Sequence, residues 1–260
     1  MYKNIEILDK EKSKELKFDN ADTTQIAKNI GLIPLGFSEV WYASHDCPVI
    51  ISSGENAEFL AFTGITPEIS IFNKSDIYIP AFIRAYPFLN VEVKDDKEQL
   101  NSVIAFDNNS DFVSEDKEFN IFDEDKNLTK EALAKVELVR ELNRQRDISK
   151  KIIAELKSND LLVKKDLRIN INSEEKTILS EFYIIDIQKF VQLDDETVAS
   201  WARKGWMGIL DAHLKSIVNF EKIFSFSEIE ANYCNTTRKF SLKSCTSMAI
   251  FNNDDEINEW

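Results

Sequence analysis

Residues 78–93 read YIPAFIRAYPFLNVEV, and two kinds of local structure meet in this stretch. Between Tyr78 and Phe88 the chain carries aromatic side chains, one arginine and two prolines, Pro80 and Pro87. Because proline fixes the backbone angle φ, the two prolines mark the ends of a segment that we expect to form one or two helical turns. From Phe88 to Val93 the residues are typical of a β-strand. The stretch therefore predicts a short helix that leads into a strand.

The region around this stretch has the composition of a turn-rich β structure. Four of the six glycines and all five prolines lie between Gly31 and Val93. β-rich runs bounded by turn residues predict an antiparallel meander here; its strands are expected at Pro48–Ile51, Phe59–Phe62, Ile69–Phe72 and Phe88–Val93. Residues 1–30 are charged and polar, and we expect them to form an N-terminal arm with a short helix near Thr24–Asn29.

The rest of the chain alternates between helical and β patterns. Apolar residues from Thr129 to Lys157 recur with the helical period, whereas Leu167–Ile171 alternates with period two and is followed by a second strand, Thr177–Ile187. From Asp194 a final helical region follows, and Gly205 and Gly208 are its candidate break points between two helices.

The sequence therefore predicts an α+β fold with a mixed, mostly antiparallel sheet in the N-terminal half and helices packed on it. Ser102–Phe106 adds a strand candidate, and a β-hairpin and a C-terminal helical segment complete the fold. We expect a single domain over residues 31–225, preceded by the polar arm 1–30. Residues 226–260 are expected to form a C-terminal extension that packs partly on the domain and ends in an acidic tail.

Composition excludes several classes of protein. Asp and Glu number 46 against 32 Lys and Arg, which gives a net charge of -14 and disfavours nucleic acid or an anionic membrane surface as partner. No stretch approaches the ~20 apolar residues that a membrane helix needs. The three cysteines lack metal-ligand spacing, and no secretory signal begins the sequence, so we expect a cytoplasmic protein with reduced thiols. A disulfide between Cys234 and Cys245 is the alternative.

Few residues offer catalytic or metal-binding chemistry. His45 and His213 are the only histidines. A facial iron triad of two histidines and a carboxylate would therefore need both of them, together with an acid such as Asp211. We expect both histidines to be structural, His45 at a loop edge and His213 packed beneath its helix. The acidic loop Asp123–Thr129 lacks the glycine and the last glutamate of a calcium loop, and is interpreted as a turn before a capped helix. Nucleophile and dinucleotide signatures are absent, and neither a cofactor nor a metal is predicted.

Two places combine aromatic and cationic side chains. In the first, Arg84 lies among Tyr78, Tyr86 and Phe88, and it is either part of a structural ion pair or an anchor for a carboxylate. In the second, Trp201 and Trp206 flank Arg203-Lys204-Gly205. We take Tyr78, Arg84, Tyr86, Phe88, Trp201 and Trp206 as candidate residues for binding a ligand or partner.

The block Tyr78–Phe88 resembles the Y-(I/V)-P-A-x-(I/L)-R-R-Y-P-F signature of the SapC family, which is named for a protein encoded with bacterial surface-layer genes. Weaker matches follow in the same order; they are Ile33-Pro34-Leu35 through Pro48-Val49-Ile50, Phe59–Gly64, Ile71-Phe72-Asn73, Asn120-Ile121-Phe122-Asp123 and Asp211–Ser216. The resemblance covers about residues 30–223. Ala85 stands where a second arginine is usual, and Lys126 where glycine is common.

The resemblance implies an accessory role in producing or secreting a surface-layer protein, by binding a peptide or protein partner. That partner would be a surface-layer or other secreted protein, or a secretion component. No family residue is known to us as catalytic, and the resemblance does not define an oligomeric state. The alternative is a small-molecule or peptide-modifying enzyme, of which a metal-dependent, oxygenase-like enzyme is one form, that would use His213, His45 and Asp211.

Overall fold

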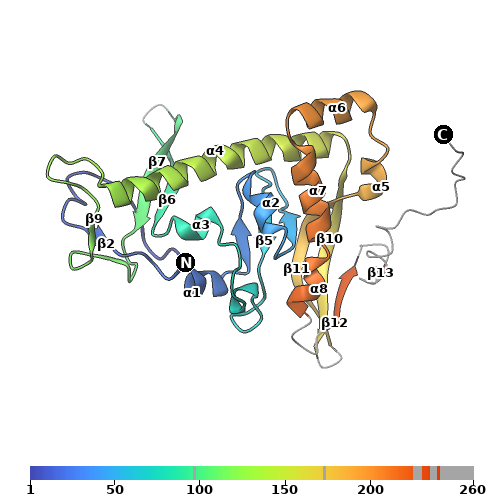
Figure 1. Ribbon diagram of the computed structural model, residues 1–260, viewed down its shortest axis with the longest axis horizontal. Helices are drawn as coiled ribbons and strands as arrows, with labels where there is room; N and C mark the ends of the chain where they lie inside the picture. The colour runs from blue at the N-terminus through green and yellow to red at the C-terminus, as the bar shows by residue number, and fades with distance from the viewer. Residues whose placement is uncertain (96–97, 172–173, 225–229, 235–238, 241–260) are drawn as a thin grey trace, which may run out of the picture.

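The computed structural model describes residues 1–95, 98–171, 174–224, 230–234 and 239–240 (Figure 1). Its strands form one seven-stranded sheet, in the order β13-β12-β10-β11-β4-β5-β3, and two three-stranded sheets, β1-β7-β6 and β8-β2-β9. The strands are β1 (Ile5–Ile7), β2 (Lys17–Phe18), β3 (Leu32–Pro34), β4 (Val49–Ile51), β5 (Phe59–Phe62), β6 (Phe88–Lys94), β7 (Leu100–Asp107), β8 (Val113–Ser114), β9 (Phe119–Asn120), β10 (Leu162–Ile171), β11 (Glu174–Ile185), β12 (Glu230–Cys234) and β13 (Lys239–Phe240). Every pairing between these described strands is antiparallel, which confirms the predicted α+β class.

One long helix, α4, connects the two halves of the molecule. It runs from Lys130 to Ser158. Figure 1 shows that it passes along the two three-stranded sheets and reaches one end of the seven-stranded sheet. Thr129 caps its start by accepting a hydrogen bond from the Ala132 amide. The other helices are α1 (Thr23–Lys28), α2 (Glu39–Ala43), η1 (Ile71–Asn73, a 3₁₀ turn), α3 (Ala81–Arg84), α5 (Ile187–Phe190), α6 (Asp195–Arg203), α7 (Met207–Ser216) and α8 (Asn219–Phe224).

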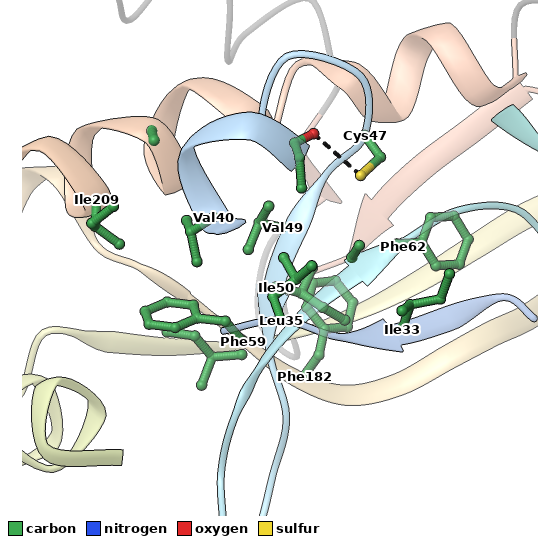
Figure 2. Packing of buried hydrophobic residues seen from close by; sticks show 14 of the residues in the cluster. Ile33, Leu35, Val40, Cys47, Val49, Ile50, Phe59, Phe62, Phe182 and Ile209 are labelled. Atoms are coloured by element: carbon green, nitrogen blue, oxygen red, sulfur yellow. Dashed lines mark hydrogen bonds between the residues drawn. The ribbon is translucent and has the colours of Figure 1, made fainter. Parts of the chain in front are cut away.

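The larger hydrophobic core lies between the seven-stranded sheet and the helices α2 and α7. Figure 2 shows Val40 of α2 and Ile209 of α7 close to Val49 and Phe59 of the sheet. Ile152, Ile153 and Leu156 add the C-terminal half of α4 to the same core. Burying an aliphatic or aromatic side chain of this size stabilises the fold by roughly 1.5–3 kcal/mol.

A second, smaller core lies beneath the other half of α4. Phe18 of β2 and Phe88 of β6 meet here edge to face, with ring centroids 5.2 Å apart, and Phe106 of β7 is buried beside them. The N-terminal half of α4 contributes Ala132, Val136 and Val139. The helical pattern of the sequence thus corresponds to one helix that serves two separate cores.

The N-terminal arm is more structured than its polar composition predicts. Besides the expected short helix, residues 1–30 provide β1, which pairs with β7, and β2, which pairs with both β8 and β9. Strands of two or three residues are too short to leave a clear alternating pattern in the sequence.

The strand predicted at Ile69–Phe72 is wrong, because Ile71–Asn73 forms a 3₁₀ turn. Ser70 makes only an isolated bridge to Gly64, and its side chain caps the turn by accepting a hydrogen bond from the Phe72 amide. Gly64 has a φ of +153°, and an added Cβ would lie 2.1 Å from the carbonyl oxygen of Ile69. This close approach bends the chain where the apolar pattern alone predicts a strand.

Several boundaries also differ from the prediction. β11 ends at Ile185, because Asp186 caps the short helix α5 through the amides of Gln188 and Lys189. Gly205, with a φ of +73°, separates α6 from α7, whereas α7 continues through Gly208. The predicted acidic tail lies outside the described residues, and so does Cys245, the second cysteine of the alternative disulfide.

Candidate partner-binding site

The block Tyr78–Phe88 forms the junction between the two cores. Pro80 precedes α3, the Tyr86–Pro87 peptide bond is cis, and Phe88 opens β6. Ile83 belongs to the larger core, whereas Ala85 and Phe88 belong to the smaller one. Pro80 has no side-chain acceptor to offer the first turn of α3, so the Ala81 amide needs a partner from elsewhere in the chain.

Glu39, at the start of α2, provides that partner. Its side chain is only 6% exposed, and its Oε1 accepts hydrogen bonds from the Ala81 amide at 2.6 Å and the Tyr78 hydroxyl at 2.8 Å. Its other oxygen, Oε2, accepts from the Gly36 amide at 2.9 Å. The carboxylate therefore holds α2 and α3 together, and its charge is stabilised by several donors rather than by one cation.

Arg84 completes this arrangement from the solvent side. Its side chain is 45% exposed, and Nη2 lies 3.8 Å from Glu39 Oε1 and 3.4 Å from the Tyr78 hydroxyl. The Nε group donates to the Ile79 carbonyl at 2.9 Å, and no hydrogen bond among the described residues uses Nη1. Arg84 is therefore part of an ion pair, but a half-exposed one that leaves one nitrogen of the guanidinium directed to no described acceptor.

Three side chains form a continuous stack on this surface, and we call it the Tyr42–Tyr78–Arg84 stack. The rings of Tyr42 and Tyr78 lie 5.4 Å apart at an interplanar angle of 23°, and the Arg84 guanidinium lies 5.8 Å from the Tyr78 ring centroid. Tyr42 is 57% exposed, and its neighbour Trp41 is 46% exposed. Large exposed aromatic side chains beside an arginine are typical of protein-binding surfaces.

The electrostatics of the stack follow from its position at the edge of the core. Burial and the nearby Glu39 carboxylate raise the pKa of Tyr78, so its hydroxyl stays protonated and available as a donor. Lys135 of α4 donates to the Arg84 carbonyl at 2.7 Å, and burial together with the Arg84 charge lowers the pKa of this lysine. Two cations thus lie next to each other in a chain whose net charge is -14.

The structure places Tyr86 and Phe88 in the interior, away from the Tyr42–Tyr78–Arg84 stack. Phe88 has no exposed surface, and Tyr86 is 5% exposed. The Tyr86 hydroxyl donates to Asp107 Oδ2 at 3.0 Å. Asp107 is itself fully buried and also accepts from the backbone amides of Lys3 and Asn4. These residues join the N-terminus to the smaller core.

Trp201 and Trp206 lie together at the other end of α4. Trp201 is 1% exposed and donates from Nε1 to Glu155, and the two indole rings are 6.3 Å apart. Lys204 lies 4.4 Å above the Trp206 ring and also pairs with Glu155, which lowers the pKa of that carboxyl group. A hollow of about 410 Å³ beside Trp201 is lined mainly by polar and acidic residues. The contacts attach α6 and α7 to α4.

The residues of the enzymatic alternative have separate environments. His213 is fully buried, and its Nε2 accepts a hydrogen bond from the Ile185 amide at 3.1 Å, which matches its expected structural role. His45 is exposed and hydrogen-bonded to the Trp41 carbonyl, while Asp211 pairs with Lys215. In the described part of the chain, no group of three or more His, Cys, Asp or Glu residues is arranged to hold a metal ion.

Cys47, two residues after His45, is not suited to act as a nucleophile. Cys47 is buried and donates to the Ala43 carbonyl, as Figure 2 shows, and burial raises the pKa of its thiol far above the usual range. A nucleophilic cysteine needs the opposite shift.

Sequence reasoning missed Glu39, Tyr42 and Asp107. The segment 38–43, SEVWYA, has a glutamate in the first turn of a short helix, and this pattern is normally read as a favourable surface charge near the helix dipole. The neighbouring Trp41 and Tyr42 were a usable signal, because two adjacent aromatic residues on a helix cannot both face one core.

The fold and the site together define an α+β protein with an exposed aromatic and arginine surface supported by a buried carboxylate. A family model described as SapC matches residues 8–223, and the chain belongs to the SapC family. The match begins closer to the N-terminus than the resemblance covering residues 30–223. No curated protein and no solved structure matches the chain. None of the helices that the structure describes has the length and apolar character needed to cross a membrane.

Proposed function

We propose that this protein is a cytoplasmic accessory factor for the production or secretion of a surface-layer protein, and that it binds a peptide or protein partner. Membership of the SapC family supports the surface-layer role. The observation that carries the binding role is the Tyr42–Tyr78–Arg84 stack, in which a half-exposed arginine lies over the Tyr78 ring, Tyr78 stacks on Tyr42, and the buried Glu39 orients the arginine.

The geometry of the stack favours a partner segment with a carboxylate next to an apolar or aromatic side chain. Arg84 Nη1 is the group that would receive the carboxylate, because Nε and Nη2 already have acceptors within the chain. The exposed faces of Tyr42 and Trp41 would receive the apolar side chain. Since Glu39 and Tyr78 fix the position of the guanidinium before binding, little side-chain entropy would be lost.

Crosslinking in the native host tests this proposal directly. A photoreactive phenylalanine analogue replaces Tyr42, which is 57% exposed, and covalent adducts are identified by mass spectrometry. The matched control carries the same analogue at Val191, which is 72% exposed and lies outside the stack. We expect adducts with a surface-layer or other exported protein, or with a secretion component, from position 42 only.

The Arg84→Ala variant supplies the second arm of the experiment. We expect it to reduce the yield of the position-42 adduct at least five-fold while changing the free energy of unfolding by less than about 1 kcal/mol. Adducts restricted to cytosolic enzymes, or an adduct yield that Arg84→Ala leaves unchanged, would refute the proposed function.

A further inference from the structure

The strand β1 forms an open edge of the sheet β1-β7-β6. Among the described strands it pairs only with β7, in the register Ile5 to Asp107, Glu6 to Phe106 and Ile7 to Ala105. The side chains of Ile5 and Ile7 are 49% and 51% exposed. Two exposed isoleucines on an unpaired edge are unusual, because natural proteins normally protect such edges with charge or proline.

The hydrogen-bond pattern shows which backbone groups face this open edge. The Asn108 amide donates to the Asn4 carbonyl, and the Leu8 amide donates to the Ile104 carbonyl. In an antiparallel ladder the hydrogen-bonded residues alternate, so residues 4, 6 and 8 bond to β7 while Ile5 and Ile7 direct their N–H and C=O groups away from it. The described residues provide no partner for these outward groups.

The sheet face next to Ile5 and Ile7 is largely apolar and belongs to neither core. On this face Asp107 and Ala105 lie directly opposite the two isoleucines in the register, and both are fully buried. The opposite face carries Phe88 and Phe106, which pack in the smaller core. Alternation along the strands puts the side chains of Leu89, Val91 and Val103 on the same face as the two isoleucines. All three are partly exposed, and none packs against either hydrophobic core.

We propose that β1 is a docking edge for an extended segment of a partner polypeptide, which adds as a fourth, antiparallel strand and carries the pattern apolar–basic–apolar. The outward groups of Ile5 and Ile7 would form the backbone hydrogen bonds, and the apolar residues of the segment would continue the face formed by Ile5, Ile7 and Leu89. This inference goes beyond the proposed function, because it uses a different surface and does not depend on the identity of the exported protein.

Glu6 determines the basic position of the segment. It is exposed, it accepts hydrogen bonds from the side-chain amides of Asn4 at 3.2 Å and Asn108 at 2.8 Å, and it takes part in none of the ion pairs among the described residues. The residue opposite Glu6 in an added strand would lie within reach of its carboxylate, where a lysine or arginine is favoured and an acidic residue is repelled.

Glu6 also disfavours a second copy of this chain as the segment that docks on β1. Symmetric antiparallel pairing through Ile5 and Ile7 would bring the two Glu6 side chains directly opposite each other. Each copy also has a net charge of -14, which adds a general repulsion.

A fluorescent heptapeptide, Val-Lys-Val-Lys-Val-Lys-Val, provides the probe, and its binding to the full chain is followed by anisotropy. N-methylation of the central valines blocks the amides that would face β1, whereas N-methylation of the lysines blocks only the opposite edge. We expect saturable binding that valine methylation weakens at least ten-fold and lysine methylation leaves within two-fold. A peptide with glutamate in place of lysine should also bind at least ten-fold more weakly.

Two variants test the protein side. Ile7→Pro removes an outward N–H and leaves the bonds to β7 intact, and we expect it to lose at least ten-fold in affinity with an unchanged urea transition. Glu6→Lys should reverse the preference, so that the glutamate peptide binds more tightly than the lysine peptide.

Four results would overturn the proposal. They are no binding of the lysine peptide, equal binding of both methylated peptides, an unchanged preference in Glu6→Lys, and a dimer of the wild type that Ile7→Pro converts to a monomer. The last result would identify a second copy as the occupant. Arg84→Ala should leave peptide binding at β1 unchanged, so that failure here and failure of the Tyr42–Tyr78–Arg84 stack are distinguishable.

Discussion

Two buried carboxylates hold the two ends of the block Tyr78–Phe88, and they do so in different ways. Glu39 binds the Tyr78 end through the Tyr78 hydroxyl and the Ala81 amide, also accepts from the Gly36 amide, and is approached by Arg84. Asp107 binds the Tyr86 end through the Tyr86 hydroxyl and also accepts from the amides of Lys3 and Asn4 in the N-terminal segment. None of the ion pairs among the described residues involves it. In both sites hydrogen-bond donors of the protein take the place of water around the carboxylate. Only the Glu39 site includes a half-exposed side chain, that of Arg84.

The difference separates a structural site from a candidate binding site within one segment. Neutral donors are sufficient to stabilise a carboxylate in the interior, as at Asp107. A half-exposed arginine over a partly exposed tyrosine adds little to stability because the charge stays in contact with water. Arg84 therefore has more to contribute to recognition than to folding, and graded substitutions at the two ends of the block can test this assignment.

The largest effect is expected for Asp107→Ala. The substitution leaves the Lys3 and Asn4 amides and the Tyr86 hydroxyl without their acceptor, and we expect the free energy of unfolding in urea to fall by about 4 kcal/mol. Asp111→Ala is the matched control, because the Asp111 side chain is 89% exposed and we expect a change below about 0.5 kcal/mol. Equal transitions for the two variants would contradict a structural role for Asp107.

The contribution of Asp107 should also depend on pH in a defined direction. Burial alone would raise the pKa of this carboxyl group, but the amides of Asn4 and Lys3 and the Tyr86 hydroxyl hydrogen-bond to the charged form, and the net effect lowers the pKa. The stabilisation is therefore fully present above the ordinary pKa of 3.8 and is lost as the pH falls through the lower pKa of the folded state. Urea unfolding between pH 5 and 2 should accordingly be less pH-dependent in Asp107→Asn than in the wild type.

Glu39→Gln should have the next largest effect. An amide group has only one acceptor oxygen, so either the Gly36 amide or the Tyr78–Ala81 pair of donors would face an NH₂ group. We expect a loss of about 2 kcal/mol in the free energy of unfolding and faster hydrogen exchange at the Ala81 amide. The exposed Glu55→Gln is the control, and a Glu39→Gln variant as stable as that control would remove Glu39 from the role of connecting α2 and α3.

The comparison also shows how far the sequence predicts this molecule. The periodicity of 129–157 predicts α4 to within a residue at each end, because a long amphipathic helix depends on local spacing. The paired runs near 167 and 177 likewise predict the hairpin β10–β11, although both strands begin earlier than expected. Elements held together mainly by contacts between residues close in the chain can therefore be predicted from a single sequence.

The hydrogen-bond partners of Glu39 and Asp107 could not be predicted from local sequence patterns. Glu39 receives its hydrogen bonds from Tyr78 and Ala81, which lie 39 and 42 residues further along the chain. The Lys3 amide reaches Asp107 across 104 residues. Whether a glutamate at the start of a short helix is a surface charge or a buried acceptor depends on such distant partners, and no local pattern carries that information.

Removing the two tyrosine hydroxyls gives a smaller and more specific comparison. We expect Tyr86→Phe to cost about 1 kcal/mol and Tyr78→Phe less, because Arg84 remains beside Glu39 when the Tyr78 hydroxyl is gone. Burial and the contact with Asp107 raise the pKa of Tyr86 to about 12, so the folded state favours the protonated phenol. The corresponding stability is present below the ordinary pKa of 10.0 and is lost as the pH rises toward about 12.

Urea unfolding at pH 7 and at pH 10.5 measures this effect. The wild type should lose more stability than Tyr86→Phe over that interval, because the variant has no phenol at this position to ionise. An identical loss in both proteins would show that other groups control the alkaline transition.

The smallest effect on stability, and the largest on binding, is expected for Arg84→Ala. Since the guanidinium is 45% exposed and lies 3.8 Å from Glu39, its removal should change the free energy of unfolding by less than about 1 kcal/mol. Glu39 keeps its hydrogen bonds from Tyr78, Ala81 and Gly36, so α2 and α3 should stay together. Arg84→Lys is the matched variant, because lysine keeps the charge but has a single nitrogen, which cannot bond to the Ile79 carbonyl and the Tyr78 hydroxyl and also present a separate donor to a partner carboxylate. If both variants fold like the wild type but lose the position-42 adduct, the Tyr78 end of the block is a recognition site; if both lose stability like Asp107→Ala, the two ends are alike and the distinction between them fails.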